Sequence, residues 1–397
     1  MTLRKYSAAK VSTTSKFSAS ANNFRTIVRR RVSVNIIIAG DPPPPPPPVY
    51  MWTWGNNGSG RLGLGNTTNY SSPVQVGALT TWSKVAGGGF HAAAIKTDGT
   101  MWSWGANYSN GRLGLGNTTS VSSPVQIGAL TTWSTVSTGD NHCAAIKTDG
   151  TMWSWGSNGY GRLGLGNTTN VSSPVQIGAL TNWLVVASGY QHSAAIKTNG
   201  TMWSWGNNLD GRLGVGDTTN VSSPVQIGAL TTWSNVFSGY RHCAAIKTDG
   251  TIWSWGQGFH SALGLGDIDN RSSPVQIGAL TTWLKLSAGG YHSSAIKTDG
   301  TMWAWGRNDN GQLGLGNTTN VSSPVQIGAL TTWLTVAAGY THRVAIKTDG
   351  TMWSWGRNNN GQLGIGDTTN RSSPVQIGAL TTWLTVAGGK YHSMAIG

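Results

Sequence analysis

The stretch HCAAIKTDGTMWSWG, residues 142–156, places Asp149-Gly150 between two runs of alternating character. Asp-Gly in this setting is the strongest short signal for a β-hairpin, because a type I′ turn needs positive φ at both of its central residues. We therefore predict two antiparallel strands joined by a type I′ turn. Asn199-Gly200 occupies the same place in the following unit, and it is the substitution that this turn chemistry readily accepts.

The hairpin belongs to a unit that recurs about every fifty residues through most of the chain. Four runs in each unit predict strands, which we number one to four: TTWSKVAGG (80–88), HAAAIKT (91–97), TMWSWG (100–105) and SSPVQIG (122–128). The proline early in strand four favours a sheet edge, since proline cannot donate to the ladder. A Trp-x-Trp pair and a third tryptophan recur seven times and together account for all 21 tryptophans.

Four antiparallel strands repeated seven times predict an all-β fold, a seven-bladed β-propeller of four-stranded antiparallel blades. The two tryptophans of Trp-x-Trp point to the same strand face. We expect them to fill the space between neighbouring blades, each burying about 200 Å². The repeats run from a strand three to a strand two, so the seventh blade must combine residues near 49–77 with residues 381–397. This two-plus-two closure would remove an open edge.

Composition divides the chain into three parts. Residues 1–41 form an extended, basic N-terminal arm, residues 42–48 are a polyproline spacer, and residues 49–397 contain the repeats. The net charge of the chain is +14, and half of it lies in the first 48 residues. We expect the seven prolines to form a polyproline II rod of about 22 Å that separates the arm from the propeller.

Catalytic and metal-binding chemistry find little support in the sequence. Glutamate is absent, and no nucleophile, base and acid stand out as a set, so we predict no enzyme activity, no catalytic residues and no cofactor. Seven histidines recur at one position of the unit without a second ligand at metal spacing. We expect each to be buried and bonded to backbone of its own blade, with no metal. Cys143 and Cys243 occupy equivalent positions and are expected to be small buried residues without a disulfide.

The segment GSGRLG, residues 58–63, matches the dinucleotide-binding pattern GxGxxG. That interpretation needs a following helix and an acid about 20 residues further on, and no acid occurs from Val49 to Phe90. We interpret the segment as a glycine-rich loop between strands three and four. No run of about 18 apolar residues exists, so no membrane span is predicted.

The units resemble the repeat of the regulator of chromosome condensation family. The pattern that carries the resemblance is Trp-x-Trp-Gly, then GRLGLG, then Pro-Val, then Gly-x-x-His-x-x-Ala-Ile, and it covers residues 50–397. The resemblance implies a seven-bladed propeller. It also implies the roles of the family's founding members, nucleotide exchange on a small GTPase and nucleosome binding, or those of other members, which are interaction modules. The units have nearly one length and lack a wedge-like insertion, and their uninterrupted array after a proline run looks more like bacterial or phage members.

Partner binding is predicted on the face formed by the one–two and three–four loops. The two–three hairpins and four–one links of the other face are almost invariant, whereas these loops vary. Variable loops on a rigid scaffold are where recognition tends to reside, and aromatic and arginine side chains favour interfaces. Neutral drift in exposed loops is the alternative explanation. The candidate partner-binding residues are Phe90, Asn141, Tyr190, Tyr240, Arg241, Phe259, His260, Tyr291, Tyr340, Lys390 and Tyr391.

The arm is predicted to anchor the propeller to other proteins. Its segment FRTIVRRRVSVNIIIAG, residues 24–40, is rich in β-branched residues that favour pairing with another strand, and its arginines could meet an acidic surface. A disordered basic extension and an organelle transit peptide are the alternatives. The candidate anchoring residues are Phe24, Arg29, Arg30, Arg31, Ile36, Ile37 and Ile38.

The leading hypothesis is a non-enzymatic structural or interaction protein, in which an arm-anchored propeller is displayed on a large assembly such as a phage particle or a cell-surface structure. Proteins would bind the arm, and a glycan or surface receptor would bind the variable face. The alternative is a nucleotide-exchange or chromatin-binding regulator, whose contacts with nucleic acid would weaken steeply with salt, although the charge of the face is no convincing nucleic-acid footprint. The third hypothesis is a glycan- or ligand-binding propeller.

Overall fold

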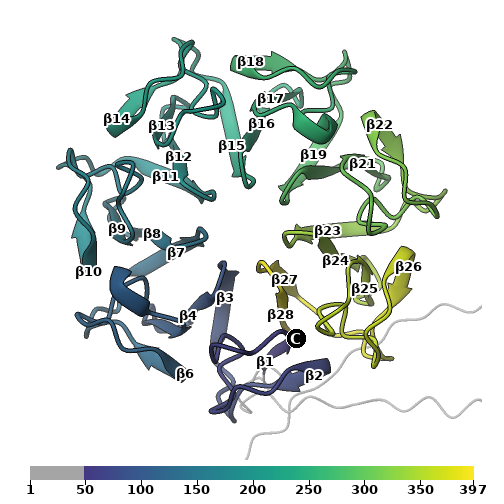
Figure 1. Ribbon diagram of the computed structural model, residues 1–397, viewed down its shortest axis with the longest axis horizontal. Helices are drawn as coiled ribbons and strands as arrows, with labels where there is room; N and C mark the ends of the chain where they lie inside the picture. Colours follow the sequence, from purple (N-terminus) through teal and green to yellow (C-terminus); the bar gives the residue numbers. More distant parts are fainter. Residues whose placement is uncertain (1–48) are drawn as a thin grey trace, which may run out of the picture. The chain divides into compact units, whose positions relative to one another are not determined.

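The computed structural model describes residues 49–397, which form seven four-stranded antiparallel blades around a central axis (Figure 1). Strand one of each blade lies nearest the axis and strand four lies at the rim (Figure 1). The predicted all-β, seven-bladed fold is confirmed. No helix among these residues is long and apolar enough to cross a membrane. The arm and the spacer predicted for residues 1–48 lie outside the described residues, so their boundaries remain predictions.

The strands fall into four sets by their place in the blade. Strand one is β3 (Trp82–Gly87), β7 (Trp133–Thr138), β11 (Trp183–Ser188), β15 (Trp233–Ser238), β19 (Trp283–Ala288), β23 (Trp333–Ala338) and β27 (Thr385–Gly388). Strand two is β4 (His91–Lys96), β8 (His142–Lys147), β12 (His192–Lys197), β16 (His242–Lys247), β20 (His292–Lys297), β24 (His342–Lys347) and β28 (His392–Ile396). Strand three is β1 (Met51–Gly55), β5 (Met101–Gly105), β9 (Met152–Gly156), β13 (Met202–Gly206), β17 (Ile252–Gly256), β21 (Met302–Gly306) and β25 (Met352–Gly356). Strand four is β2 (Tyr70–Gln75), β6 (Val121–Gln126), β10 (Val171–Gln176), β14 (Val221–Gln226), β18 (Arg271–Gln276), β22 (Val321–Gln326) and β26 (Arg371–Gln376). Two single-turn 3₁₀ helices, η1 (Tyr108–Asn110) and η2 (Phe259–Ser261), lie in three–four loops.

The closing blade joins the two ends of the repeat array. Its strand order is β2-β1-β28-β27, and β1 pairs antiparallel with β28, starting with Met51 opposite Ile396. Beyond this pair, Tyr50 and Gly397 exchange two backbone hydrogen bonds of 3.0 Å. The predicted two-plus-two closure is confirmed, and the ring is closed by a complete ladder rather than by an open edge.

The hairpins between strands two and three contain a turn that differs from the predicted one. The φ angle is positive at Gly99 (+77°) but not at Asp98, and the Gly99 N–H donates to the carbonyl of Lys96 over 3.0 Å. This is a three-residue loop that ends in a left-handed glycine, so the predicted type I′ turn is wrong although the hairpin is confirmed. Asp98 accepts from the backbone N–H and the hydroxyl of Thr100 at 2.9 and 2.7 Å. The asparagine of the third unit makes the same two bonds.

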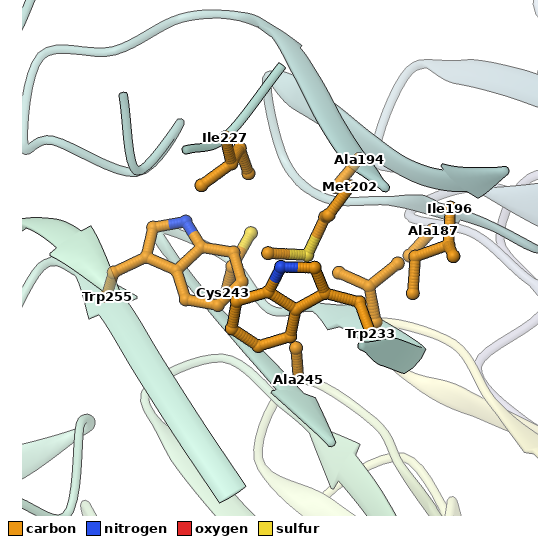
Figure 2. Packing of buried hydrophobic residues seen from close by; sticks show 10 residues of the cluster. Ala187, Ala194, Ile196, Met202, Ile227, Trp233, Cys243, Ala245 and Trp255 are labelled. Atoms are coloured by element: carbon orange, nitrogen blue, oxygen red, sulfur yellow. The ribbon is translucent and has the colours of Figure 1, made fainter. Parts of the chain in front are cut away.

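Hydrophobic clusters fill the junctions between neighbouring blades, one at each of the seven junctions. In the cluster shown in Figure 2, Met202 and Ile227 come from one blade and Trp233, Cys243 and Trp255 come from the next. The second tryptophan of each Trp-x-Trp is fully buried here, as predicted, whereas the first is half-buried. Burial of about 200 Å² at about 25 cal/mol per Å² contributes up to about 5 kcal/mol per indole. This packing outweighs the roughly 1 kcal/mol net gain from one hydrogen bond.

A polar seam crosses the same junctions. Trp205 Nε1–H and the hydroxyl of Ser193 both donate to the carbonyl oxygen of Arg162 in the preceding blade, over 2.9 and 3.0 Å. Nε2 of His142, also in the preceding blade, lies 2.9 Å from Ser193 Oγ. Since the serine gives its only proton to the carbonyl, His142 must donate its Nε2–H to the serine. The seam therefore fixes the histidine tautomer and connects the two blades at this junction. The indole bond recurs at five of the seven junctions, whereas Trp305 and Trp355 Nε1 have no acceptor among the described residues.

The prediction that each histidine bonds to backbone of its own blade is wrong. Nε2 of five of the seven recurrent histidines meets a serine or cysteine side chain of the next blade. His292 and His392 are the exceptions, because Arg343 and Ala92 occupy the equivalent position of the next blade. The predicted burial of the histidines is confirmed, and the two cysteines are small, buried and free, as predicted. Cys143 and Cys243 also form hydrogen bonds of 3.0 and 3.1 Å with histidine Nε2 atoms of the preceding blade, a role that the sequence analysis did not assign.

The seam gives a paired test of stability. Ser193→Ala leaves the His142 N–H buried without an acceptor, and we expect it to lower the free energy of unfolding by about 1–3 kcal/mol. Ala92→Ser supplies His392 Nε2, which has no partner within residues 49–397, with the missing acceptor, and it should stabilise the chain by about 1 kcal/mol. Urea unfolding followed by tryptophan fluorescence measures both changes. Shifts of the same sign would contradict the proposed seam.

Burial of the histidines also predicts a pH dependence. It lowers the pKa of His142 to about 3 and that of His242 to about 4, whereas a histidine in an unfolded chain titrates near 6.5. Below about pH 6.5 the unfolded chain therefore binds protons that the folded chain excludes. We expect the free energy of unfolding to fall between about pH 6.5 and pH 4, by about 1.4 kcal/mol per pH unit for each such histidine. A urea midpoint that is unchanged from neutral pH to about pH 5 would contradict this expectation.

Candidate functional site

The one–two and three–four loops emerge on one side of the propeller, which we call the loop face. Around the axis, the one–two loops are joined by backbone hydrogen bonds, including Gly89 N–H to Gly139 O (3.2 Å) and Lys390 N–H to Gly88 O (3.1 Å). Their glycines line an open axial cavity of about 120 Å³, which is smaller than the roughly 300–1,000 Å³ of typical small-molecule sites. Within residues 49–397, no three His, Cys, Asp or Glu side chains gather into a possible metal site.

Aromatic side chains from four neighbouring blades meet above this cavity. The rings of Tyr190 and Tyr240 are stacked, with 3.9 Å between their centres. Tyr340 and Tyr291 pack against Tyr240 at 5.0 and 5.6 Å. All four side chains are half-buried, and burial raises the pKa of the Tyr240 and Tyr340 hydroxyls above the ordinary value. Tyr240 is therefore the centre of a neutral aromatic cluster on the axis.

Lys390 brings a positive charge into the same cluster. Its Nζ lies 3.1 Å from Asp140 Oδ1, and the two side chains are only 16% and 9% exposed. Lys390 and Asp140 belong to blades that are separated by one intervening blade. Gly89 of that blade leaves space for Asp140, because a Cβ atom on Gly89 would lie 2.7 Å from the Asp140 carbonyl oxygen. The Nζ lies 5.2–5.9 Å from the ring centres of five aromatic residues, within the range of cation–π attraction: Phe90, Tyr190, Tyr240, Tyr340 and Tyr391.

The remaining predicted residues extend the cluster over the loop face. Phe259 and His260, in η2, lie 6.5 and 5.5 Å from the ring of Tyr291, and Phe259 is 53% exposed. Two further contacts complete the set: the Arg241 guanidinium lies 5.8 Å from the ring of Tyr240, and Asn141 donates to Asp140 over 3.0 Å. The structure thus brings all eleven predicted residues into one connected group.

Buried arginines lie next to this group, and the sequence analysis did not predict their burial. They occupy one position of the three–four loop, where each is at most 4% exposed, and burial lowers the pKa of Arg61 to about 10. The available signal was weak: Arg is replaced by Ala or Gln at this loop position in three of the seven units. The seven residues at this position are Arg61, Arg112, Arg162, Arg212, Ala262, Gln312 and Gln362.

The partners of these arginines differ from blade to blade. Arg212 forms an ion pair with Asp210. Arg61 makes two long hydrogen bonds, of 3.3 Å to a backbone carbonyl and 3.4 Å to Ser59 Oγ. At this loop position, arginines without an ion pair to a described residue therefore occur in the three consecutive blades that contain Arg61, Arg112 and Arg162. Outside this position, Arg343 is also fully buried, and it bonds only to neutral oxygens.

Nε and Nη1 of Arg112 and Nε of Arg162 are buried and have no hydrogen-bond partner among the described residues. Their guanidinium carbons lie instead 5.2 and 5.6 Å from the ring centres of Tyr108 and Tyr160. These two tyrosines are 53% and 40% exposed. Each of these two guanidinium groups is thus covered by a tyrosine side chain that is itself partly exposed on the loop face.

Lateral grooves between blades are a second feature that the sequence analysis missed. Hollows of about 350–710 Å³ lie between neighbouring outer strands. One is lined by Leu315, Leu330, Trp353 and Pro374, and equivalent residues line the others. The leucine of the GALTTW link, Leu330 in this groove, is 46–50% exposed in every unit. These grooves recur with the repeat, in contrast to the single, varied cluster on the axis.

The fold and the loop face define a repeat propeller in which an almost invariant scaffold displays one varied surface. The chain belongs to the RCC1-like domain family. The model of the RCC1-like domain matches residues 50–287, and that of the Regulator of chromosome condensation (RCC1) repeat matches residues 299–346 and 349–396. The family resemblance inferred from the sequence is confirmed.

Individual relatives match shorter segments. The chain is 37% identical over 116 residues to the Ultraviolet-B receptor UVR8 of Arabidopsis thaliana (28% of this chain, 26% of the receptor). It is 38% identical over 116 residues to the Probable E3 ubiquitin-protein ligase HERC6 of Homo sapiens (27% and 11%). The matches thus span about a quarter or less of these relatives. Among solved structures, human WBSCR16 has a TM-score of 0.79 at 22% identity (88% of this chain, 98% of that chain). Prp20p of Saccharomyces cerevisiae has a TM-score of 0.78 at 22% identity (88% and 91%). These two structures share the fold.

The charges at the axis predict that removing the carboxylate of Asp140 destabilises the chain more than removing the ammonium group of Lys390. Asp140 attracts the buried cations Arg61, Arg112 and Arg162 as well as Lys390. Asp140→Asn therefore leaves several cations without compensation, and we expect it to lower the free energy of unfolding by about 3 kcal/mol or more. Lys390→Met leaves Asp140 near other cations and should cost less than about 1 kcal/mol. Urea unfolding of both variants measures the difference. An equal or larger loss for Lys390→Met would contradict this charge balance.

Proposed function

We propose that this chain is a non-enzymatic, protein-binding propeller of the regulator type, which recognises a protein partner through its loop face. The observation that carries the proposal is the convergence of eleven varied side chains into one group around Tyr240 and Lys390. Half-buried aromatic side chains with a charged neighbour are typical of the residues that dominate protein interfaces. The scaffold beneath them repeats almost unchanged, which agrees with selection acting on the loops.

The relatives support protein recognition in this family. The structure of Prp20p is described together with its binding properties to Gsp1p and histones, and a further structure shows Kap60 bound to yeast RCC1 (Prp20). These partners belong to Prp20 and indicate the kind of ligand, not its identity, for this chain. They favour a regulator that binds proteins over a component of a virus particle.

A glycan-binding role for the aromatic loops has less support. Sugars bind aromatic residues through an open ring face, but Tyr190 and Tyr240 stack on each other and Tyr340 packs edge-on against Tyr240. The axial cavity of about 120 Å³ is also too small for a typical ligand. Display on a large assembly through the arm remains a prediction, because the anchoring residues lie outside the described part of the chain.

The proposal is tested by capturing a partner with the full-length chain and comparing variants of the two sides of the propeller. The loop-face variant combines Phe259→Asn, Tyr291→Thr and Tyr391→Thr, changes that copy residues such as Asn359 and Thr341 in other blades. Removing three interface aromatics should weaken binding of the captured partner at least about tenfold in calorimetry.

The matched control variant, Leu180→Asn with Leu330→Asn, removes exposed apolar side chains from the four–one links. It should bind the partner as the unaltered chain does. If the leucine variant loses the partner and the aromatic variant retains it, recognition takes place at the lateral grooves and the proposal is wrong.

A further inference from the structure

One sector of the loop face contains more positive than negative charge in a buried setting. We call Arg61, Arg112, Arg162, Lys390 and Asp140 the arginine sector. The three arginines are 3–4% exposed, and the side chains of Lys390 and Asp140 are 16% and 9% exposed. Four cations and one carboxylate leave an excess of three positive charges.

An unneutralised buried charge is costly, because the group has lost its hydration without gaining a counter-charge. Arg112 and Arg162 share the single carboxylate of Asp140 with Arg61 and Lys390, and their guanidinium carbons lie 5.2 and 5.6 Å from the centres of aromatic rings. Four other arginines of the loop face have an aspartate of the same loop beside them: Arg212, Arg271, Arg307 and Arg371. Arg241 and Arg357 form no ion pair with a described residue, but each is only half-buried. The arginine sector is distinct in that three consecutive blades each contain a buried arginine without an aspartate of its own loop.

Access to the guanidinium groups requires only side-chain motion. Tyr108 and Tyr160, which contact Arg112 and Arg162, are 53% and 40% exposed, and exposed side chains change rotamer within nanoseconds. Tyr108 is joined to the neighbouring blade through a contact of 3.2 Å between its hydroxyl and Ser59 Oγ. A ligand that replaced these rings would meet planar N–H donors that suit oxyanions.

We propose that the arginine sector binds an acidic segment of the protein partner, with partner carboxylates supplying the counter-charges that this chain lacks. This inference rests on the proposed function and gives the partner's chemistry. A peptide fits better than nucleic acid for two reasons. The unpaired cations form a compact group rather than a long basic stripe, and their aromatic surroundings offer contacts to a polypeptide. Asp140 is the one carboxylate of the arginine sector, so further counter-charges would have to come from the partner.

The test uses the full-length chain and a fluorescein-labelled deca-glutamate peptide, with binding followed by fluorescence anisotropy at neutral pH and physiological salt. The variant Arg112→Gln/Arg162→Gln copies the glutamines that the chain places at 312 and 362, so it is compatible with the fold. We expect it to bind the peptide about tenfold or more weakly. Its thermal unfolding midpoint should be unchanged or higher, since buried unpaired charges are removed.

The matched control is Arg271→Val/Arg371→Val, which removes two arginines from the same face and copies the valine of other blades. Their exposed ion pairs with Asp267 and Asp367 should contribute little, so the peptide affinity should change less than about twofold. The basic arm is present in every variant and cancels from the comparison. Equal losses in the two variants would show that peptide binding follows total charge, and this would overturn the inference.

Single-stranded decathymidylate distinguishes the other source of oxyanions. If it binds more tightly than the peptide and Arg112→Gln/Arg162→Gln abolishes that binding, the occupant is nucleic acid and the inference is overturned. Two further outcomes separate this inference from the proposed function. In the first, the aromatic loop-face variant loses the captured partner but Arg112→Gln/Arg162→Gln still binds the peptide as the unaltered chain does; the acidic-segment inference is then wrong and the proposed function stands. In the second, Arg112→Gln/Arg162→Gln loses the peptide but the aromatic loop-face variant still captures the partner; the proposed function is then wrong and the inference stands.

Discussion

The rest of the structure depends on one contact, the insertion of the second tryptophan of each Trp-x-Trp pair between two blades. Trp104 is fully buried, and its Nε1–H donates to the carbonyl oxygen of Arg61 in the preceding blade over 2.9 Å. A Cβ atom on Gly63 would approach Nε1 of the same ring to 2.8 Å. The loop sequence GRLG therefore accommodates the neighbouring indole, because Gly63 leaves space for the ring and the carbonyl of Arg61 accepts its hydrogen bond. Arg61 thus has two roles: its carbonyl accepts the indole hydrogen bond that joins two blades, and its side chain contributes positive charge to the loop face. The same short loop therefore contributes to the scaffold and to the charge of the loop face.

The features that the sequence predicted are those that repeat within one unit. Trp-x-Trp, the Asp-Gly hairpin and the edge proline fix the strands and the number of blades, and the offset of the repeats fixes the closure. The features that it missed depend on the next blade or on conformation. The histidine partner lies across a junction, and sequence reasoning treated each unit alone. The turn type was misjudged because Asp98 uses its carboxylate, not a positive φ, to stabilise the turn. The burial of Arg112 was not predicted, because a repeat considered one unit at a time does not show which side chains of the neighbouring blades cover it.

Closure of the ring is what assembles the candidate site. Lys390 and Asp140 are 250 residues apart in the chain but 3.1 Å apart in the structure, because the one–two loops of all seven blades meet at the axis. Six blades contribute one or two of the eleven varied residues and the blade of β15–β18 contributes four, so the recognition surface is a property of the whole ring. This arrangement separates stability, which the repeated seams provide, from specificity, which the varied loops provide. It also explains how a chain of nearly identical units can present one asymmetric face with a cationic sector on one side and an aromatic cluster beside it.

The central claim is that the repeated elements build the ring and the varied loops recognise a partner. Hydrogen–deuterium exchange of the full-length chain, with and without a captured partner, tests this claim most directly, because it reports backbone protection along the chain. The account predicts slower exchange on binding in the one–two and three–four loops, strongest around residues 108–112, 139–141 and 389–391, with no change in the two–three hairpins. Slower exchange confined to the two–three hairpins or the four–one links would contradict it.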